Sequence, residues 1–186
     1  MTGSPGEIPM ADVQAFFLTW TTYGSWLPGD ARGWVRKPGE FMAPDANRES
    51  SARQRMTEAE LTLDAQQRDI VERTIAEHSQ MRGWYLHAVA CRAQHVHVVL
   101  TASDCAADDV LRQLKAWCTH RLKEHLSTCE ARRETLPGSS YAAQSSNREK
   151  WWTQGGSRRS LYDDNSLTAA IAYVREGQDS PRLERG

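Results

Sequence analysis

Several short segments of the chain are rich in apolar, aromatic or β-branched residues, and turn residues flank them. WYLHAVACR (84–92) and QHVHVVLTA (94–102) are such segments, and their very short connection predicts a β-hairpin. AFFLTWTTYG (15–24) is rich in aromatic and β-branched residues and predicts an earlier strand. KWWTQGGSRRSLYDD (150–164) predicts two short extended pieces on either side of a Gly-Gly turn.

Other segments repeat apolar residues at helical spacing. One such stripe predicts a helix over 57–80, and Gly83 follows its end. A second helix is expected to begin after Ser103 or Asp104, and a third to span 166–176 and end at Gly177. The apolar stripe of the third helix consists of Leu167, Ala170, Ile171 and Val174.

Between the first strand and the first predicted helix, the Pro- and Gly-rich SWLPGDARGWVRKPGE (25–40) and the polar APDANRESSARQR (43–55) predict a loop. The order of elements is therefore β, α, β, β, α, short β pieces and α. The economical arrangement for this order is an α+β fold, in which an antiparallel sheet has its helices packed on one face.

Length, composition and charge indicate a protein of one soluble domain. The chain has 186 residues, 39% of them hydrophobic, and a formal net charge of −1, so a polybasic nucleic-acid coat is not indicated. No run of about 18 apolar residues occurs, and the first residues lack the pattern of a secretory signal, so we expect a cytoplasmic protein without a membrane partner. Its four cysteines form no CxxC pair and are expected to be reduced thiols.

The expected domain organisation is a flexible N-terminus over 1–12, one domain over 13–178 and a C-terminal tail over 179–186. Gly, Pro and Ser dominate the first of these segments, and we find no internal repeat in the chain.

Two histidines lie one residue apart in the strand AQHVHVVL (93–100). Because side chains alternate along a strand, His95, His97 and Val99 share one face, and the Cα atoms of the two histidines are roughly 7 Å apart. Two neutral imidazoles held in this way can converge on one divalent metal. For an isolated HxH pattern, the more common situation is two half-exposed histidines on a solvent-facing strand, and local sequence alone does not exclude it.

The interpretation of the histidine pair depends on other parts of the sequence, because several further motifs occur in a fixed order along the chain. CRAQHVHVVL (91–100) resembles the His-hydrophobe-His strand of the HUH single-tyrosine transposases, in particular the REP-associated branch. FFLTWTTYGSWLPGD (16–30) is similar to the first strand of one branch, and LKAWCTHRLKEH (114–125) to the helix after the HUH strand. The segment that begins with KWWTQGG and ends at Gln178 is similar to the terminal block of the family.

This resemblance implies a ferredoxin-like fold, a divalent metal (Mg²⁺ or Mn²⁺) and single-stranded DNA as the substrate. It also implies a tyrosine nucleophile at Tyr173 and metal ligands at His95 and His97. The expected DNA is a hairpin-containing element end or a REP-like repeat, and a homodimer is possible because some relatives share active sites between subunits.

The third metal ligand is less well defined by the sequence. The family often has an amide four residues after the tyrosine, but here that position is Gly177. Gln178 could serve if the helix breaks at this glycine, and Glu176 is an alternative.

Tyr173 lies on the flank of the apolar stripe of the last helix, where it could equally pack its ring and expose its hydroxyl. Tyr162 is the competing nucleophile, because it lies near cationic residues in RRSLYDD.

A basic and aromatic segment is a candidate surface for DNA. Basic residues interleaved with aromatic ones suit flexible single strands, although a solvated loop with one core tryptophan has the same composition. The candidate residues are Arg132, Arg133, Arg148, Lys150, Trp151, Trp152, Arg158 and Arg159.

The sequence thus favours an enzyme that nicks and rejoins single-stranded DNA through a 5′-phosphotyrosine on Tyr173. Two alternatives remain open at this point. One is another HUH nuclease, of the replication-initiator or relaxase type, and the other is a domesticated DNA-binding protein that has lost catalysis.

Overall fold

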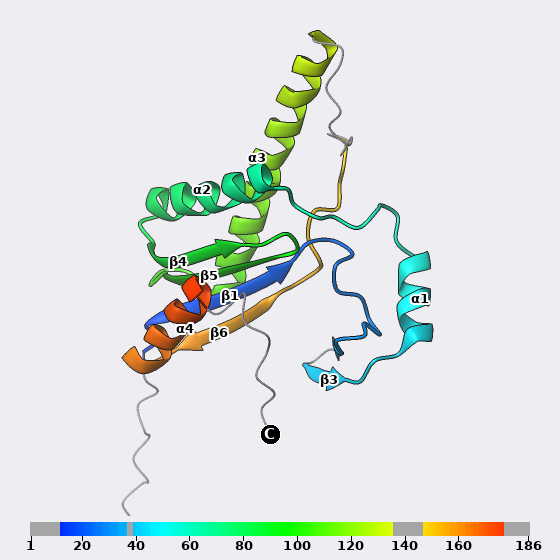
Figure 1. The fold of residues 1–186 in the computed structure, drawn as a ribbon. Helices are drawn as coiled ribbons and strands as arrows, with labels where there is room; N and C mark the ends of the chain where they lie inside the picture. Colours follow the sequence, from blue (N-terminus) through cyan, green and yellow to red (C-terminus); the bar gives the residue numbers. More distant parts are fainter. Residues whose placement is uncertain (1–11, 37–38, 136–146, 177–186) are drawn as a thin grey trace, which may run out of the picture.

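The centre of the protein is a four-stranded antiparallel sheet (Figure 1). The computed structural model describes residues 12–36, 39–135 and 147–176, with side chains up to residue 129 in the second range. The strand order is β4-β5-β1-β6. The strands are β1 (Ala15–Thr21), β4 (Tyr85–Cys91), β5 (His95–Thr101) and β6 (Ser157–Leu161).

One face of this sheet carries the main hydrophobic core, beneath α2 (Ala65–Met81) and α3 (Ala107–Thr135). Val96, Val98 and Leu100 point into this core from β5, because every second residue of the strand faces the same side. With these two helices as crossovers, the chain follows β-α-β-β-α-β connectivity. The predicted α+β, ferredoxin-like fold is therefore confirmed.

The last helix, α4 (Asp164–Glu176), differs from the expectation that all helices share one face. Ala170 and Val174 of α4 form a second core with Ala88, Ala90 and Val99, on the side of the sheet opposite α2 and α3. Small side chains on β4 let the helix approach the sheet closely, and Figure 1 shows α4 lying across the strands on this side. The predicted apolar stripe of α4 is correct, but it packs against the opposite face of the sheet from α2 and α3.

A small lobe inserted between β1 and α2 was predicted only as loop. It contains the two-stranded sheet of β2 (Trp34–Arg36) and β3 (Glu40–Met42), followed by α1 (Ala46–Gln54). The strands have three residues each, too few to show a period of two. In α1 only Ala52 is buried, so the helix has no apolar stripe, and its start is marked instead by the Asp45 cap.

The predicted start of the first long helix at Thr57 is also wrong. The helix begins after Asp64, whose carboxylate accepts from the Gln67 backbone N–H while the Gln67 side chain accepts from the Asp64 N–H. Leu61 and Leu63 are fully buried in a segment without regular secondary structure before it. The spacing of Leu63 to Ile70 and Val71 fits a helical period by coincidence.

The described helices include none that is both long and apolar enough to cross a membrane. Residues 1–11 and 177–186 lie outside the described part of the chain, so the expected flexible terminus and tail stay predictions.

Replacing Asp64 by alanine should lower the free energy of unfolding by about 1 kcal/mol, because the capping box at the start of α2 is lost. Thr57→Ala is the matched control, since Thr57 is exposed outside the helix and should change stability by less than about 0.5 kcal/mol. Urea unfolding followed by circular dichroism measures both. Equal losses in the two variants would contradict the assigned helix start.

Candidate active site

The two strand histidines lie beneath α4, on the face of the sheet that carries the second core. The ring centroids of His95 and His97 are 4.9 Å apart, with the rings at 75° to each other. His97 is 7% exposed and His95 is half-buried, because β5 is a central strand and α4 covers the end of the pair nearer Val99. The structure therefore places the pair inward of the surface rather than on a fully solvated strand.

The neighbouring strand β1 fixes the His97 ring. Thr19 is the cross-strand partner of His97, and its Oγ1 lies 2.8 Å from the His97 Nδ1 atom. Phe17, two residues earlier on the same face, stacks on the imidazole at 26° with 5.8 Å between centroids. One ring nitrogen of His97 is thus engaged with the protein, and the other, Nε2, is not part of that hydrogen bond.

The surroundings of His97 keep its ring neutral. Burial is the main cause that lowers the pKa of His97 to about 4, and the nearby charges of His95 and Arg92 contribute smaller parts of the same shift. A neutral imidazole retains the lone pair that a metal or a proton needs, so this ring is ready to act as a ligand or a base at neutral pH.

Tyr173 extends from α4 to this histidine within the same chain. Its ring meets His97 edge-on at 88° with 5.6 Å between centroids, and it also meets Phe17 at 5.9 Å. Tyr173 is 47% exposed, so the phenol lies between the site and solvent. The orientation follows from helical geometry, because Ala170 and Val174 face the sheet and place Tyr173 on the flank between sheet and solvent.

A polar contact anchors the C-terminal end of α4 close to the tyrosine. The Arg175 guanidinium donates to the backbone carbonyl of His87 on β4 at 3.1 Å. Together with the apolar contacts of Ala170 and Val174, this bond holds the turn of α4 that carries Tyr173 against the sheet.

The competing tyrosines are placed differently. Tyr162 is 46% exposed after β6, and its ring contributes to none of the aromatic contacts around His97. The Tyr23 hydroxyl accepts from the Thr57 backbone N–H, and Tyr85 packs on His87. Of the tyrosines in the described ranges, Tyr173 is the one that contacts the histidine pair.

The donor set fits a metal only in part. His95 and His97 are adjacent, and His97 is neutral, as ligation requires. Within the described residues, however, no group of three His, Cys, Asp or Glu side chains is positioned to hold a metal. Glu176 is exposed at the end of α4, and Gln178 lies outside the described residues, so the third ligand stays a prediction.

Of the two predicted DNA-stacking residues, Trp151 is buried and Trp152 is partly buried against the main core. Trp151 is 2% exposed and donates its indole N–H to the Arg148 carbonyl, so its ring cannot stack on a base. Trp152 packs edge-on against Trp20 and donates to Thr119 of α3 at 2.9 Å. The sequence could not distinguish these roles, because a tryptophan pair among basic residues has the same composition whether it is buried or exposed.

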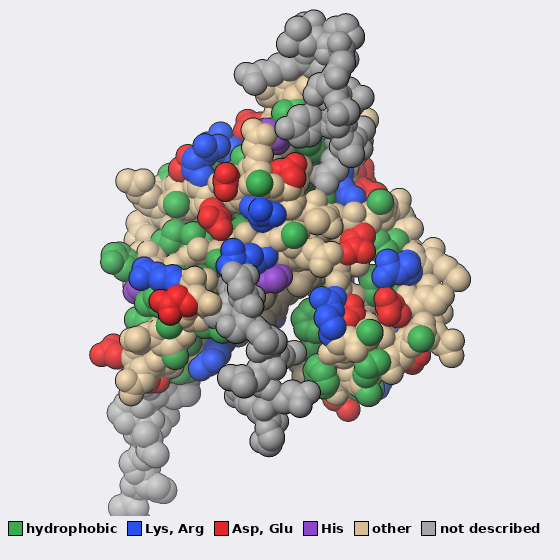
Figure 2. All heavy atoms as spheres, viewed as in Figure 1, with side chains coloured by type: hydrophobic (Ala, Val, Ile, Leu, Met, Phe, Trp, Pro, Cys, Tyr) green, Lys and Arg blue, Asp and Glu red, His purple; other side chains and the backbone are tan. Residues whose placement is uncertain are grey.

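Two of the four described basic residues of the same segment, Arg148 and Arg158, form ion pairs within the protein. Arg148 is only 10% exposed and bonds to Glu58 and to the Ala59 carbonyl. Arg158 pairs with Asp108, whereas Lys150 and Arg159 are exposed. Arg132 and Arg133 have side chains outside the described part. Arg148 and Arg158 thus join this segment to other elements, while a contact of the segment with DNA stays a prediction. Figure 2 shows basic and acidic side chains intermixed across this view of the molecule.

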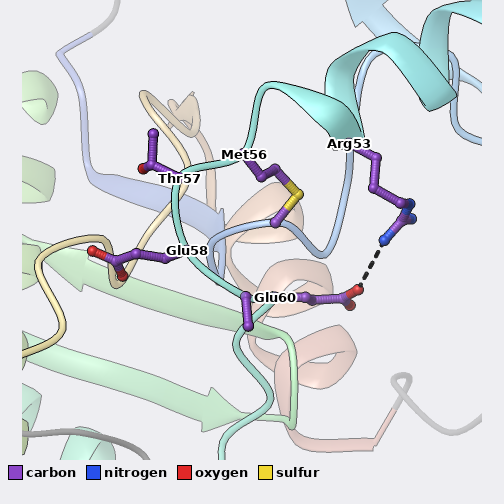
Figure 3. Close-up of a pocket in the computed structure, with 6 residues that line it drawn as sticks. Arg53, Met56, Thr57, Glu58 and Glu60 are labelled. Carbon is purple, nitrogen blue, oxygen red and sulfur yellow. Dashed lines mark ion pairs between the residues drawn. The ribbon is translucent and has the colours of Figure 1, made fainter.

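A shallow pocket lies where the small lobe joins the sheet, in the segment from Arg53 to Glu60 (Figure 3). Its two carboxylates already have partners. Glu60 pairs with Arg53 at 3.6 Å and accepts from Gln94, while Glu58 binds Arg148. The pocket therefore has the contacts of a structural junction and not those of a second catalytic centre.

This chain is similar to known proteins only at the level of solved structures. No protein-family model and no curated protein sequence matches the chain. A REP-associated tyrosine transposase solved with a REP hairpin aligns over 93% of this chain and 70% of its own, at 10% identity and a TM-score of 0.47. A protein from Deinococcus radiodurans R1 with a provisional transposase assignment aligns over 94% and 96%, at 12% identity and a TM-score of 0.42.

The sequence analysis missed two residues of the site, Thr19 and Phe17. Both lie in AFFLTWT (15–21), which predicts a strand, and their role depends on the register between β1 and β5. The signal that could have found them is the period-two pattern of β1, which places them on the face opposite Leu18 and Trp20.

Because His97 is neutral in the fold, its burial makes stability depend on pH. The unfolded chain binds a proton near pH 6.5, whereas the folded protein binds it only near pH 4, so stability rises with pH across this interval. In metal-free buffer, the wild type should gain up to about 3 kcal/mol between these pH values relative to His97→Gln. Urea unfolding at stepped pH tests this, and parallel curves for the two proteins would contradict a buried neutral His97.

Proposed function

We propose that the protein is a transposase-type endonuclease and strand transferase that acts on single-stranded DNA, with Tyr173 as the nucleophile. The observation that carries the proposal is the contact of the Tyr173 ring with His97, next to His95, within one chain. The ordered motifs of the sequence single out all three residues. His95 and His97 come from one segment, and Tyr173 comes from another that lies 76 positions after His97.

The reaction follows from the chemistry of a phenol at a phosphodiester. The Tyr173 oxygen attacks the phosphorus, the bond from phosphorus to the 3′-oxygen breaks, and a free 3′-hydroxyl leaves. The DNA remains bound to Tyr173 through its 5′-phosphate. Because the phosphodiester energy is retained in this linkage, the 3′-hydroxyl of another strand can attack it and complete strand transfer.

The chain contributes position and charge management to this step. α4 holds Tyr173 against the sheet, and its 47% exposure leaves the phenol open both to an incoming strand and to water that accepts its proton. Phe17 limits the position of Tyr173 on one side through an edge-on ring contact. Together, α4 and Phe17 limit the directions from which the Tyr173 phenol can approach the histidine pair.

His95 and His97 are the residues that would hold a divalent metal, Mg²⁺ or Mn²⁺, with Gln178 as the proposed third ligand. A bound metal would neutralise the phosphate oxygens that otherwise repel an anionic nucleophile. The neutrality of His97 supports this assignment, because a protonated imidazole has no lone pair to donate.

The nucleophile can be tested with hairpin-bearing single-stranded oligonucleotides of randomised flanks, labelled at the 3′ end, in buffer with Mn²⁺. The wild type should form a labelled covalent adduct that survives denaturing electrophoresis, because the 5′-phosphate fragment stays on the protein. Tyr173→Phe should form none, while Tyr162→Phe should retain the adduct. An adduct in Tyr173→Phe, or its loss only in Tyr162→Phe, would overturn the assignment.

The metal ligands can be tested by Mn²⁺ binding in the absence of DNA. His95→Gln and His97→Gln should each weaken binding by tenfold or more, because each removes one of the two imidazole donors. His87→Gln is the matched control, since His87 lies on the neighbouring strand and bonds to Thr101. Titration followed by electron paramagnetic resonance gives the affinities, and equal binding in all three variants would place the metal elsewhere.

A further inference from the structure

The threonine opposite His97 is suited to determine which nitrogen of that ring carries the proton. Thr19 pairs with His97 in the register of β1 and β5, and its hydroxyl oxygen lies 2.8 Å from Nδ1. A neutral imidazole has one N–H and one lone pair, so the partner of one nitrogen fixes the state of the other.

Two arrangements are chemically available, and they have opposite consequences. If the Thr19 hydroxyl donates to Nδ1, the proton of His97 sits on Nε2, and that atom cannot bind a metal or accept a proton. If Nδ1–H donates to the Thr19 oxygen, the lone pair of His97 is on Nε2. Only the second arrangement makes His97 useful to the site that the proposed function requires.

We propose that Thr19 is a positioning residue that accepts the Nδ1–H of His97 and so presents the Nε2 lone pair to the metal and phosphate site. The inference rests on the proposed function, because that function is what distinguishes the two hydrogen-bond directions. It matches the general rule that a ligating histidine donates its other N–H to a protein acceptor.

The packing around His97 opposes a flip of the imidazole ring that would exchange the positions of Nδ1 and Nε2. Phe17 stacks on one side of the imidazole, and the rings of His95 and Tyr173 meet it edge-on. Thr19 is β-branched and lies in the middle of a strand, which restricts its χ1 angle and so the position of its hydroxyl oxygen. Nδ1 therefore stays with Thr19.

The second threonine of the same strand face provides an internal contrast. Thr21 lies opposite His95 in the register, as Thr19 lies opposite His97. However, the Thr21 hydroxyl bonds to the Thr153 hydroxyl at 2.8 Å, which ties β1 to the segment before β6. The two threonines therefore have different hydrogen-bond partners: Thr19 contacts His97, whereas Thr21 bonds to Thr153.

Nitrogen-15 NMR of the metal-free protein at neutral pH, with the His97 signal assigned through His97→Gln, measures the tautomer directly. The wild type should show His97 with a protonated Nδ1 and an unprotonated Nε2. In Thr19→Val, which keeps the shape of the side chain but removes the acceptor, the His97 signals should shift toward a mixture of tautomers. Thr19→Ser should restore the wild-type pattern, and Thr21→Val should leave it unchanged.

Mn²⁺ affinity of the same proteins supplies a second measurement. Thr19→Val should bind Mn²⁺ about tenfold more weakly, and Thr19→Ser should recover most of that loss. A wild-type His97 protonated on Nε2, or one whose tautomer Thr19→Val leaves unchanged, would overturn the inference, and the wild-type spectrum decides even if Thr19→Val fails to fold. Failure of the proposed function would look different, because wild-type Mn²⁺ would then not bind at His95 and His97 while the tautomer result stood.

Discussion

The structure of the site depends on the antiparallel pairing of β1 with β5. This register places Thr19 opposite His97 and Thr21 opposite His95, and it sends Val96, Val98 and Leu100 into the main core. A slip of one residue would turn both histidines into that core and the valines outward, at a cost that no local contact could offset. The burial of the apolar half of β5 therefore holds the histidine pair on the opposite face.

The second constraint is the packing of α4 on that same face. Ala88 and Ala90 leave room for the helix, and Ala170 and Val174 fill it, so Tyr173 meets His97 without being buried. The site is thus a small layer between a central strand and one terminal helix. Its ingredients are a neutral buried imidazole, a half-buried imidazole and a half-exposed phenol, which together suit nucleophilic attack on a phosphodiester.

Local patterns were sufficient to predict much of this arrangement. The period of β5 separates His95 and His97 from the core valines, and the stripe of α4 places Tyr173 on its flank, so both could be inferred from the sequence. Thr19 could not, because its role follows from a cross-strand register that joins residues 78 positions apart. α1 was missed because it buries only Ala52, and Trp151 was misassigned because composition does not report burial.

The central claim is that His95, His97 and Tyr173 of one chain form a single metal-assisted site. A crystal structure of the protein with Mn²⁺, measured at a wavelength where manganese scatters anomalously, tests it most directly. The account predicts an anomalous peak bounded by the imidazoles of His95 and His97, with the Tyr173 ring of the same chain beside it. A peak bound elsewhere, or one at the histidine pair with Tyr173 turned away from it, would contradict the account.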